Sequence, residues 1–236
     1  MTPPTRPPQA GAGAAALAAA PALAHSARLE RLRAAPRKPG TATFFYWDAH
    51  FRNDAVKVLP GEYFVHDEDI LITTTLGSCI AACLWDRERR IGGMNHFMLP
   101  DGSGQGQAQS GGRYGGDAME LLINALLARG ASRQMLEAKV FGGGAVLAGM
   151  GSANVGERNT RFVLDYLQTE RIPIISRDVL DNCPRKVCFF PASGKALVKR
   201  LAPAQAAAVA QHDGAASARS APALSASAGG GALELF

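Results

Sequence analysis

The chain has 236 residues and a formal net charge of +5, from 25 lysines and arginines against 20 acidic residues. The excess lies in the first 43 residues, with six basic side chains and one acidic; residues 44–201 hold 18 against 17. A nucleic-acid-binding domain gathers its basic side chains on folded structure, so this distribution argues against one. The length argues against a large multidomain enzyme.

Aromatic residues mark the part of the chain that can fold. Fifteen of the sixteen lie within residues 44–201, and aromatic side chains supply much of the buried area of a core. We expect a single domain over residues 44–201, which is a usual domain size. Residues 1–43 are rich in Ala and Pro, and residues 202–236 in Ala, Gly and Ser. Both tails are predicted to be disordered because they have few large apolar side chains.

The first half of the core has strand patterns. Runs of β-branched and apolar residues are separated by turn signals such as Pro60-Gly61 and the charged segment Asp86–Arg90. The predicted strands are Val56–Leu59, Glu62–Val65, Asp69–Thr75, Ile80–Trp85 and Ile91–Leu99. The Gly-rich polar segment Asp101–Gly116 follows. A loop of this length in a domain is usually functional or mobile.

The second half mixes helices and strands. Apolar residues at helical spacing predict a helix over Asp117–Arg129, with Asp117 as N-cap and Gly130 as C-cap, and another over Asn154–Arg171. The predicted strands are Ala138–Phe141, Ile172–Ser176, Lys186–Phe190 and Ala196–Leu201. This order predicts an α+β fold, a mixed β-sheet sandwich with two main helices packed on one side.

The sequence predicts a cytoplasmic protein without membrane insertion. It has no run of about 18 strongly apolar residues, as a transmembrane helix requires. The apolar segment Ala10–Ala24 follows Arg6 and ends in an A-x-A pattern that a secretory signal could use, but it is mostly alanine and Pro21 interrupts it. A secreted cysteine hydrolase, cleaved near Ala24, is the alternative.

Four cysteines form two close pairs, Cys79 with Cys83 and Cys183 with Cys188. Such spacing suggests zinc, but four residues along a strand span about 13 Å, whereas two ligands of one zinc lie within about 4 Å. We therefore expect no metal, and no other cofactor. Cys83, Cys183 and Cys188 are interpreted as small core residues.

The segment Phe141–Gly151 is rich in glycine, as phosphate-binding loops are. It lacks the Gly-Lys-Ser/Thr ending of a P-loop and the spacing of a dinucleotide fingerprint. A nucleotide site is therefore not favoured. Gly142–Gly144 is predicted instead to let the backbone pass close to another element.

The segment with the most chemical information joins Cys79 and His96. If the strands Ile80–Trp85 and Ile91–Leu99 form a hairpin with loop Asp86–Arg89, opposed residue numbers sum to 175 and Cys79 faces His96. Directly opposed Cβ atoms lie about 4.5–5.5 Å apart. A histidine at this distance can take the thiol proton and create the thiolate nucleophile.

Neighbouring residues can complete this pair. Thr73, Thr74 and Thr75 lie just upstream, and any of them could orient the imidazole. Gly77 and Ser78 are small, so the backbone can turn sharply before Cys79 and offer its N–H groups to an oxyanion.

Several short segments follow one another along the core: Ala55–Thr75 with LPGEYFV, Leu76–Cys79 (LGSC), Gly92–Pro100 (GGMNHFMLP), Lys139–Gly144 (KVFGGG), Asn154–Asn159 (NVGERN) and Arg185–Val187 (RKV). Together they resemble CheD, the family of chemoreceptor glutamine deamidases. The resemblance runs from about Asp54 to Leu201, and the combination is specific although a single piece such as GSC is not.

The resemblance implies a role for three residues. Cys79 stands where the family has its nucleophile, His96 where it has its general base, and Thr73 where a threonine completes the triad; Thr74 and Thr75 stand where some members have Leu-Gly. The implied reaction is hydrolysis of a glutamine side-chain amide in a chemoreceptor through a thioester on Cys79. The same machinery could cleave glutamate methyl esters.

The resemblance also implies partners. These are methyl-accepting chemotaxis receptors and, in some systems, a CheC-type phosphatase. The competing hypothesis is a non-catalytic adaptor that binds the same partners. The joint presence of Cys79, His96 and Thr73 favours catalysis, since a binding module would not need all three.

Overall fold

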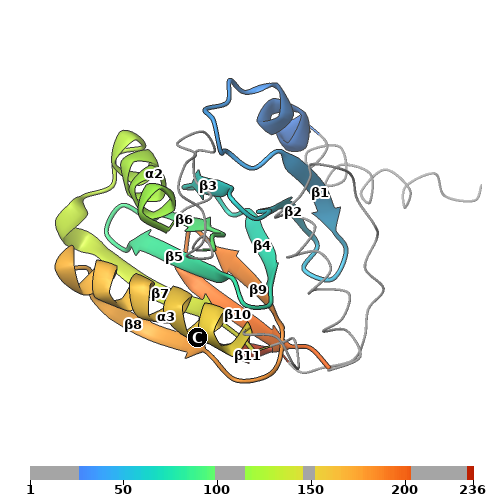
Figure 1. Cartoon of the computed structure of the whole chain (residues 1–236). Coiled ribbons are helices and arrows are strands. Elements are labelled where there is room, and N and C mark those ends of the chain that lie inside the picture. The colour runs from blue at the N-terminus through green and yellow to red at the C-terminus, as the bar shows by residue number, and fades with distance from the viewer. Residues whose placement is uncertain (1–26, 99–114, 146–151, 203–232) are drawn as a thin grey trace, which may run out of the picture.

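Two β-sheets face each other in the computed structural model, which describes residues 27–98, 115–145, 152–202 and 233–236 (Figure 1). The six-stranded sheet has the order β1 (Phe44–Asp48), β2 (Asn53–Lys57), β4 (Leu71–Leu76), β9 (Arg185–Phe190), β10 (Lys195–Arg200), β11 (Glu234–Leu235). The five-stranded sheet has the order β3 (Tyr63–His66), β6 (Ile91–Asn95), β5 (Ile80–Asp86), β7 (Leu136–Gly142), β8 (Ile174–Val179). Both are mixed, because β2 pairs with β4 and β7 with β8 in parallel.

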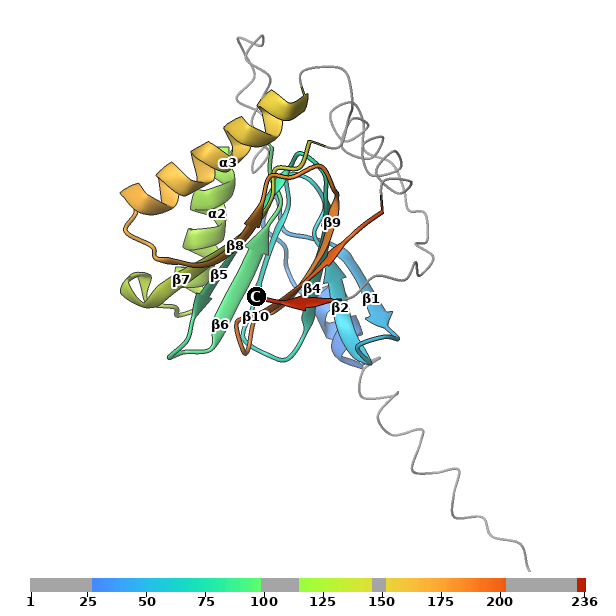
Figure 2. The same ribbon diagram turned by 90° about the horizontal axis from the view of Figure 1, so that it is seen from below.

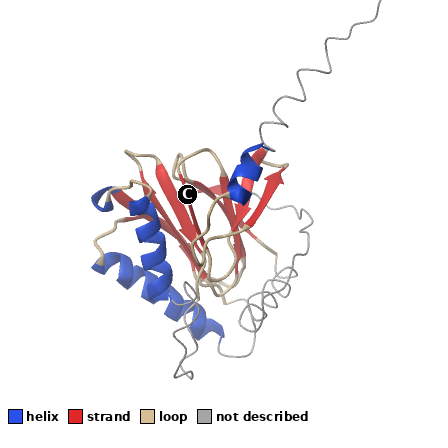
Figure 3. Cartoon of the chain, turned by 90° about the horizontal axis from the view of Figure 1, so that it is seen from above, coloured by secondary structure: helices blue, strands red, loops and turns tan. Residues whose placement is uncertain are grey.

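The two long helices cover the five-stranded sheet. α2 (Gly115–Ala128) and α3 (Ser152–Thr169) pack on the five-stranded sheet, and a one-turn 3-10 helix, η1 (Arg133–Met135), precedes β7. Figures 2 and 3 show both long helices on this side. The predicted α+β sandwich with two main helices on one side is therefore confirmed.

Burial on both faces explains the sequence of β5. Ala81 and Cys83 face the core between the sheets, whereas Ile80, Ala82 and Leu84 face the core under the helices. A strand covered on both faces needs apolar residues at every position. This is why β5 reads as a continuous apolar run rather than an alternating pattern.

The predicted strands and helices of the core are present, with ends shifted by a few residues. The structure describes four elements that were not predicted: β1, β11, η1 and a short helix over residues 27–34. Two of them fall in segments that were expected to be disordered, so that expectation is corrected for residues 27–34 and 233–236. Residues 1–26 and 203–232, with the apolar segment Ala10–Ala24, lie outside the described residues, as does most of Asp101–Gly116.

Single large apolar side chains explain both corrections. Leu29 of the short helix is 7% exposed and joins the core between the sheets. Phe236 follows β11, pairs through its backbone with Ala196, and places its ring 5.7 Å from that of Phe141. Composition averaged over a tail does not reveal such anchors. Among the helices that the structure describes, none is long and apolar enough to span a membrane.

Candidate active site

The hairpin formed by β5 and β6 carries the two residues singled out by the sequence, Cys79 and His96. Cys83 pairs with Met94 and Asp86 with Ile91, so the numbers of opposed residues sum to 177 rather than the predicted 175. The prediction that Cys79 lies directly opposite His96 is therefore wrong in register.

Asp86 explains the difference. Its carboxylate accepts hydrogen bonds from the backbone N–H groups of Glu88 and Arg89, both at 3.0 Å, and from Ser132 at 2.7 Å. Arg90 closes the loop with a positive φ of 56°. These bonds place Asp86 at the end of the strand, whereas the prediction put it in the loop.

Although the predicted register is wrong by two residues, Cys79 and His96 still lie on the same face of the sheet. A shift by two residues keeps side chains on the same side of a sheet, because the side-chain period is two. Ile80 and Phe97 exchange two backbone hydrogen bonds at 2.9 Å beyond the hairpin ladder. Cys79 and His96 are therefore diagonal neighbours, a relation with Cβ atoms about 7 Å apart. Both are buried, 0% and 1% exposed.

His96 directly follows β6 and is fixed through its backbone. Its N–H donates to the carbonyl of Glu62 at 2.9 Å, and its carbonyl accepts from the N–H of Gly61 at 2.7 Å. The turn that precedes β3 therefore holds the histidine in place.

The side chain of Thr74, on β4 of the other sheet, contacts the imidazole. Thr74 Oγ1 lies 2.8 Å from His96 Nδ1 and 2.7 Å from the carbonyl oxygen of Val58. A carbonyl only accepts, so the single hydroxyl proton goes to Val58 and the hydroxyl accepts from His96. His96 then carries its proton on Nδ1 and, when neutral, has its basic lone pair on Nε2.

Thr73 is not brought to His96. Successive residues of a strand point to opposite faces, and the Thr73 hydroxyl lies 2.9 Å from the hydroxyl of Tyr46 on the far side of the sheet. Burial raises the pKa of Tyr46 to about 12, so this phenol stays protonated. The alternation of faces could have separated Thr73 from Thr74, but only with the orientation of the strand known.

The turn that carries Cys79 lies directly against the glycine run. The N–H groups of Gly143 and Gly144 donate to the carbonyls of Cys79 and Gly77, both at 2.8 Å. Gly142 has a φ of +113°, and a Cβ there would lie 2.1 Å from the carbonyl oxygen of Cys79. The prediction that these glycines let the backbone approach another element is confirmed.

Helix α3 holds the same turn from the other side. Asn159 is fully buried, and its Nδ2 donates to the carbonyl of Ser78 at 2.8 Å. Gly156 contacts Gly143 so closely that a Cβ on it would lie 2.3 Å from the Gly143 carbonyl oxygen. The segment NVGERN thus supplies the contact surface and an amide donor. We did not predict a role for Asn159; a polar side chain on the buried side of an amphipathic helix was the available signal.

Two further buried polar residues brace the region. Asn95 accepts from the N–H of Ala82 and donates to the carbonyl of Ala118, both at 3.0 Å, and so ties β5 and β6 to α2. Arg185 is fully buried, with its Nε 3.1 Å from a carboxylate oxygen of Asp178. Both belong to segments that carried the family resemblance.

Two of the other cysteines, Cys83 and Cys188, are poor nucleophiles. Burial raises the pKa of the Cys83 thiol well above its usual range and that of Cys188 to about 11. Both thiols therefore stay protonated, and both are buried as predicted. Cys183 is only half-buried, so its interpretation as a core residue is wrong. Within the described segments, no three histidine, cysteine or acidic side chains are grouped so that they could hold a metal ion.

Comparisons with known proteins agree on one family. The family model described as CheD chemotactic sensory transduction matches residues 98–200. A relative from Albidiferax ferrireducens, named probable chemoreceptor glutamine deamidase CheD 1, is 66% identical over 175 residues, 74% of this chain and 74% of the relative. A relative of the same name from Dechloromonas aromatica is 58% identical over 160 residues, 68% of this chain and 80% of the relative.

Proposed function

The chain belongs to the CheD family, and we propose that it is a chemoreceptor glutamine deamidase. Its substrates would be glutamine side chains in the cytoplasmic helices of methyl-accepting chemotaxis receptors, and its products glutamate and ammonia. The observation that carries the proposal is the bond between Thr74 and His96. Because the hydroxyl proton of Thr74 is engaged by Val58, the imidazole is held in the tautomer that a general base requires.

The proposed reaction begins with a proton transfer. His96 Nε2 takes the thiol proton of Cys79, and the thiolate attacks the carboxamide carbon of the glutamine. The tetrahedral intermediate collapses when the imidazolium gives its proton to the amide nitrogen, which leaves as ammonia. A thioester between Cys79 and the substrate remains.

The second half restores the enzyme. His96 takes a proton from water, and the hydroxide formed attacks the thioester carbon. The carbon–sulfur bond breaks, glutamate leaves as the carboxylic acid, and the proton on the imidazole returns to the sulfur. The Nδ1 proton of His96, held by Thr74, does not move in either half. In this proposal Thr74 takes the orienting role that the resemblance implied for Thr73.

The backbone around Gly77 and Ser78 is proposed to stabilise the oxyanion. In a planar trans peptide the N–H points opposite to the C=O. Asn159 holds the Ser78 carbonyl towards α3, so the N–H of Cys79 in the same peptide points away from the helix. A donor fixed in this way costs no reorganisation when charge develops on the substrate oxygen.

Intact-mass measurement of a receptor cytoplasmic fragment tests the proposal. Each conversion replaces an NH2 group by OH, and Cys79→Ala should abolish the mass change while the fragment still binds; Cys183→Ala is the matched cysteine control and should keep full activity. Deamidation by Cys79→Ala would overturn the thiol mechanism. Binding without any mass change by the unaltered protein would favour the adaptor hypothesis, with receptors or a CheC-type phosphatase as partners.

A further inference from the structure

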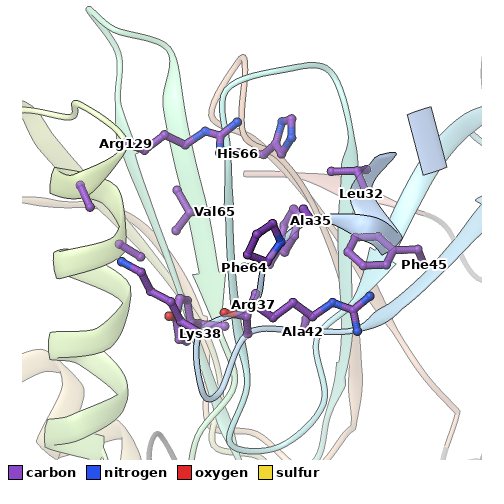
Figure 4. A pocket seen from close by; sticks show the side chains of 15 residues that line it. Leu32, Ala35, Arg37, Lys38, Ala42, Phe45, Phe64, Val65, His66 and Arg129 are labelled. Carbon is purple, nitrogen blue, oxygen red and sulfur yellow. The ribbon is translucent and has the colours of Figure 1, made fainter. Parts of the chain in front are cut away.

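A groove lies on the side of the molecule where the short helix over residues 27–34 approaches β3 and α2 (Figure 4). Its volume is about 350 Å³, within the range of ligand-binding clefts. Phe45 and Phe64 form its floor with Ala42, and their rings meet edge to face at 5.7 Å. The groove therefore offers an apolar surface to a side chain of a bound molecule.

Cations surround this floor. Arg37, Lys38 and Arg129 line the groove, and Arg37 lies with its guanidinium carbon 5.9 Å from the centre of the Phe45 ring. Arg129 is paired at 2.6 Å with Asp67, which does not line the groove. Arg37 and Lys38 are both exposed, so the lining carries an excess of positive charge.

The groove follows β3 towards the candidate active site. Tyr63 lines one end, and it pairs with Asn95, the residue before His96. The two residues before Tyr63, Gly61 and Glu62, hold the backbone of His96 at 2.7 and 2.9 Å. A chain segment lying along the groove would therefore approach the strand end that carries His96.

We propose that this groove binds an acidic segment of the substrate protein, next to the glutamine that reacts. The proposal rests on the proposed function, and it adds a reason why the enzyme would prefer some glutamines of the substrate protein over others. The basic rim complements carboxylates, and the aromatic floor accepts an apolar side chain between them. Glutamines in an acidic surrounding are then preferred over glutamines in a neutral one. The walls contributed by residues 32–42 lie outside the segment matched by the family model.

Charge reversal in the full chain tests the groove. The double variant Arg37→Glu/Lys38→Glu should raise KM for a receptor cytoplasmic fragment about tenfold at low salt and leave kcat unchanged, because rim charges act mainly on association. The difference should shrink as added salt shortens the screening length. Arg31→Glu is the matched control: Arg31 is exposed on the same short helix and does not line the groove.

A second substrate distinguishes weaker binding of the receptor fragment in the groove from an effect of the substitutions on the candidate active site. With a short neutral glutamine peptide, the double variant and the unaltered protein should have equal kcat/KM. An equal loss on both substrates would show that the cations act on the reactive centre, and it would overturn the groove proposal. An unchanged KM for the receptor fragment would overturn it as well.

Failure of the proposed function would look different. In that case the unaltered protein would deamidate neither substrate. Binding of the receptor fragment, followed by fluorescence anisotropy, would still be weakened by Arg37→Glu/Lys38→Glu if the groove receives an acidic segment. Equal binding by the unaltered protein and the double variant would contradict the groove whatever the activity.

Discussion

The candidate active site and the groove are built from different interactions. At the site, buried polar groups bond at 2.7–2.8 Å and the glycines leave no room for a methyl group. At the groove, Arg37 and Lys38 are exposed and surround an apolar floor. Short contacts fix geometry, which bond-making requires, whereas exposed charges act over longer distances and tolerate movement. Substitutions should therefore have abrupt effects at the site and graded, salt-dependent effects at the groove.

The largest effect is expected at Gly142. A Cβ there meets the Cys79 carbonyl oxygen at 2.1 Å, and its φ of +113° is unfavourable for any other residue. We expect Gly142→Ala to lower the free energy of unfolding by about 4 kcal/mol or more, because backbone rather than a movable side chain must give way. Urea denaturation measures this.

Gly116→Ala is the control for that substitution. Gly116 lies in α2 with no other atom within 4 Å of the added Cβ. Alanine should stabilise the helix there by roughly 0.5–1 kcal/mol. A Gly142→Ala variant as stable as the unaltered protein would show that the turn at Cys79 is not held by this contact.

His66, which lines the groove, should make the protein sensitive to acid. Burial, reinforced by the charge of Arg129, lowers the pKa of His66 to about 4, whereas in the unfolded chain it is about 6.5. As the pH falls from about 6.5 to about 4, only the unfolded chain takes up this proton, so the free energy of unfolding decreases, by about 3 kcal/mol in total.

The variant His66→Gln isolates this contribution. Its free energy of unfolding should fall less than that of the unaltered protein across the same pH interval. Above about pH 6.5, the pKa of histidine in the unfolded chain, the difference between the two proteins should be constant. Denaturation curves at a series of pH values provide the measurement. Parallel stability curves would mean that His66 titrates normally in the folded protein.

The smallest effect distinguishes two adjacent threonines. Thr74→Val should lower kcat by about 10- to 100-fold, part of what general acid–base catalysis contributes, because His96 loses the oxygen that orients it. Thr74→Ser keeps that oxygen and should restore most of the activity. Thr73→Val removes the bonds to the Tyr46 hydroxyl and the Val56 carbonyl, neither of which involves His96, and should change kcat by less than about threefold. A larger loss in Thr73→Val than in Thr74→Val would reverse the assignment.

Local patterns determined much of this protein. Continuous apolar runs predicted the strands that are buried on both faces, and helical spacing predicted α2 and α3 within a few residues. The order of segments around Cys79 and His96 identified the family, and it suggested the chemistry that we propose. Each of these depends on interactions between residues close in the chain, which a sequence displays directly.

The tertiary structure decided the rest. The register of the hairpin depends on the carboxylate of Asp86, and the choice of Thr74 over Thr73 depends on which face β4 turns to the other sheet. Asn159 meets Ser78 only because α3 packs on the turn, and the groove forms only where residues 32–42 fold back onto β3. These relations join segments far apart in the chain, so their geometry follows from packing rather than from any local pattern.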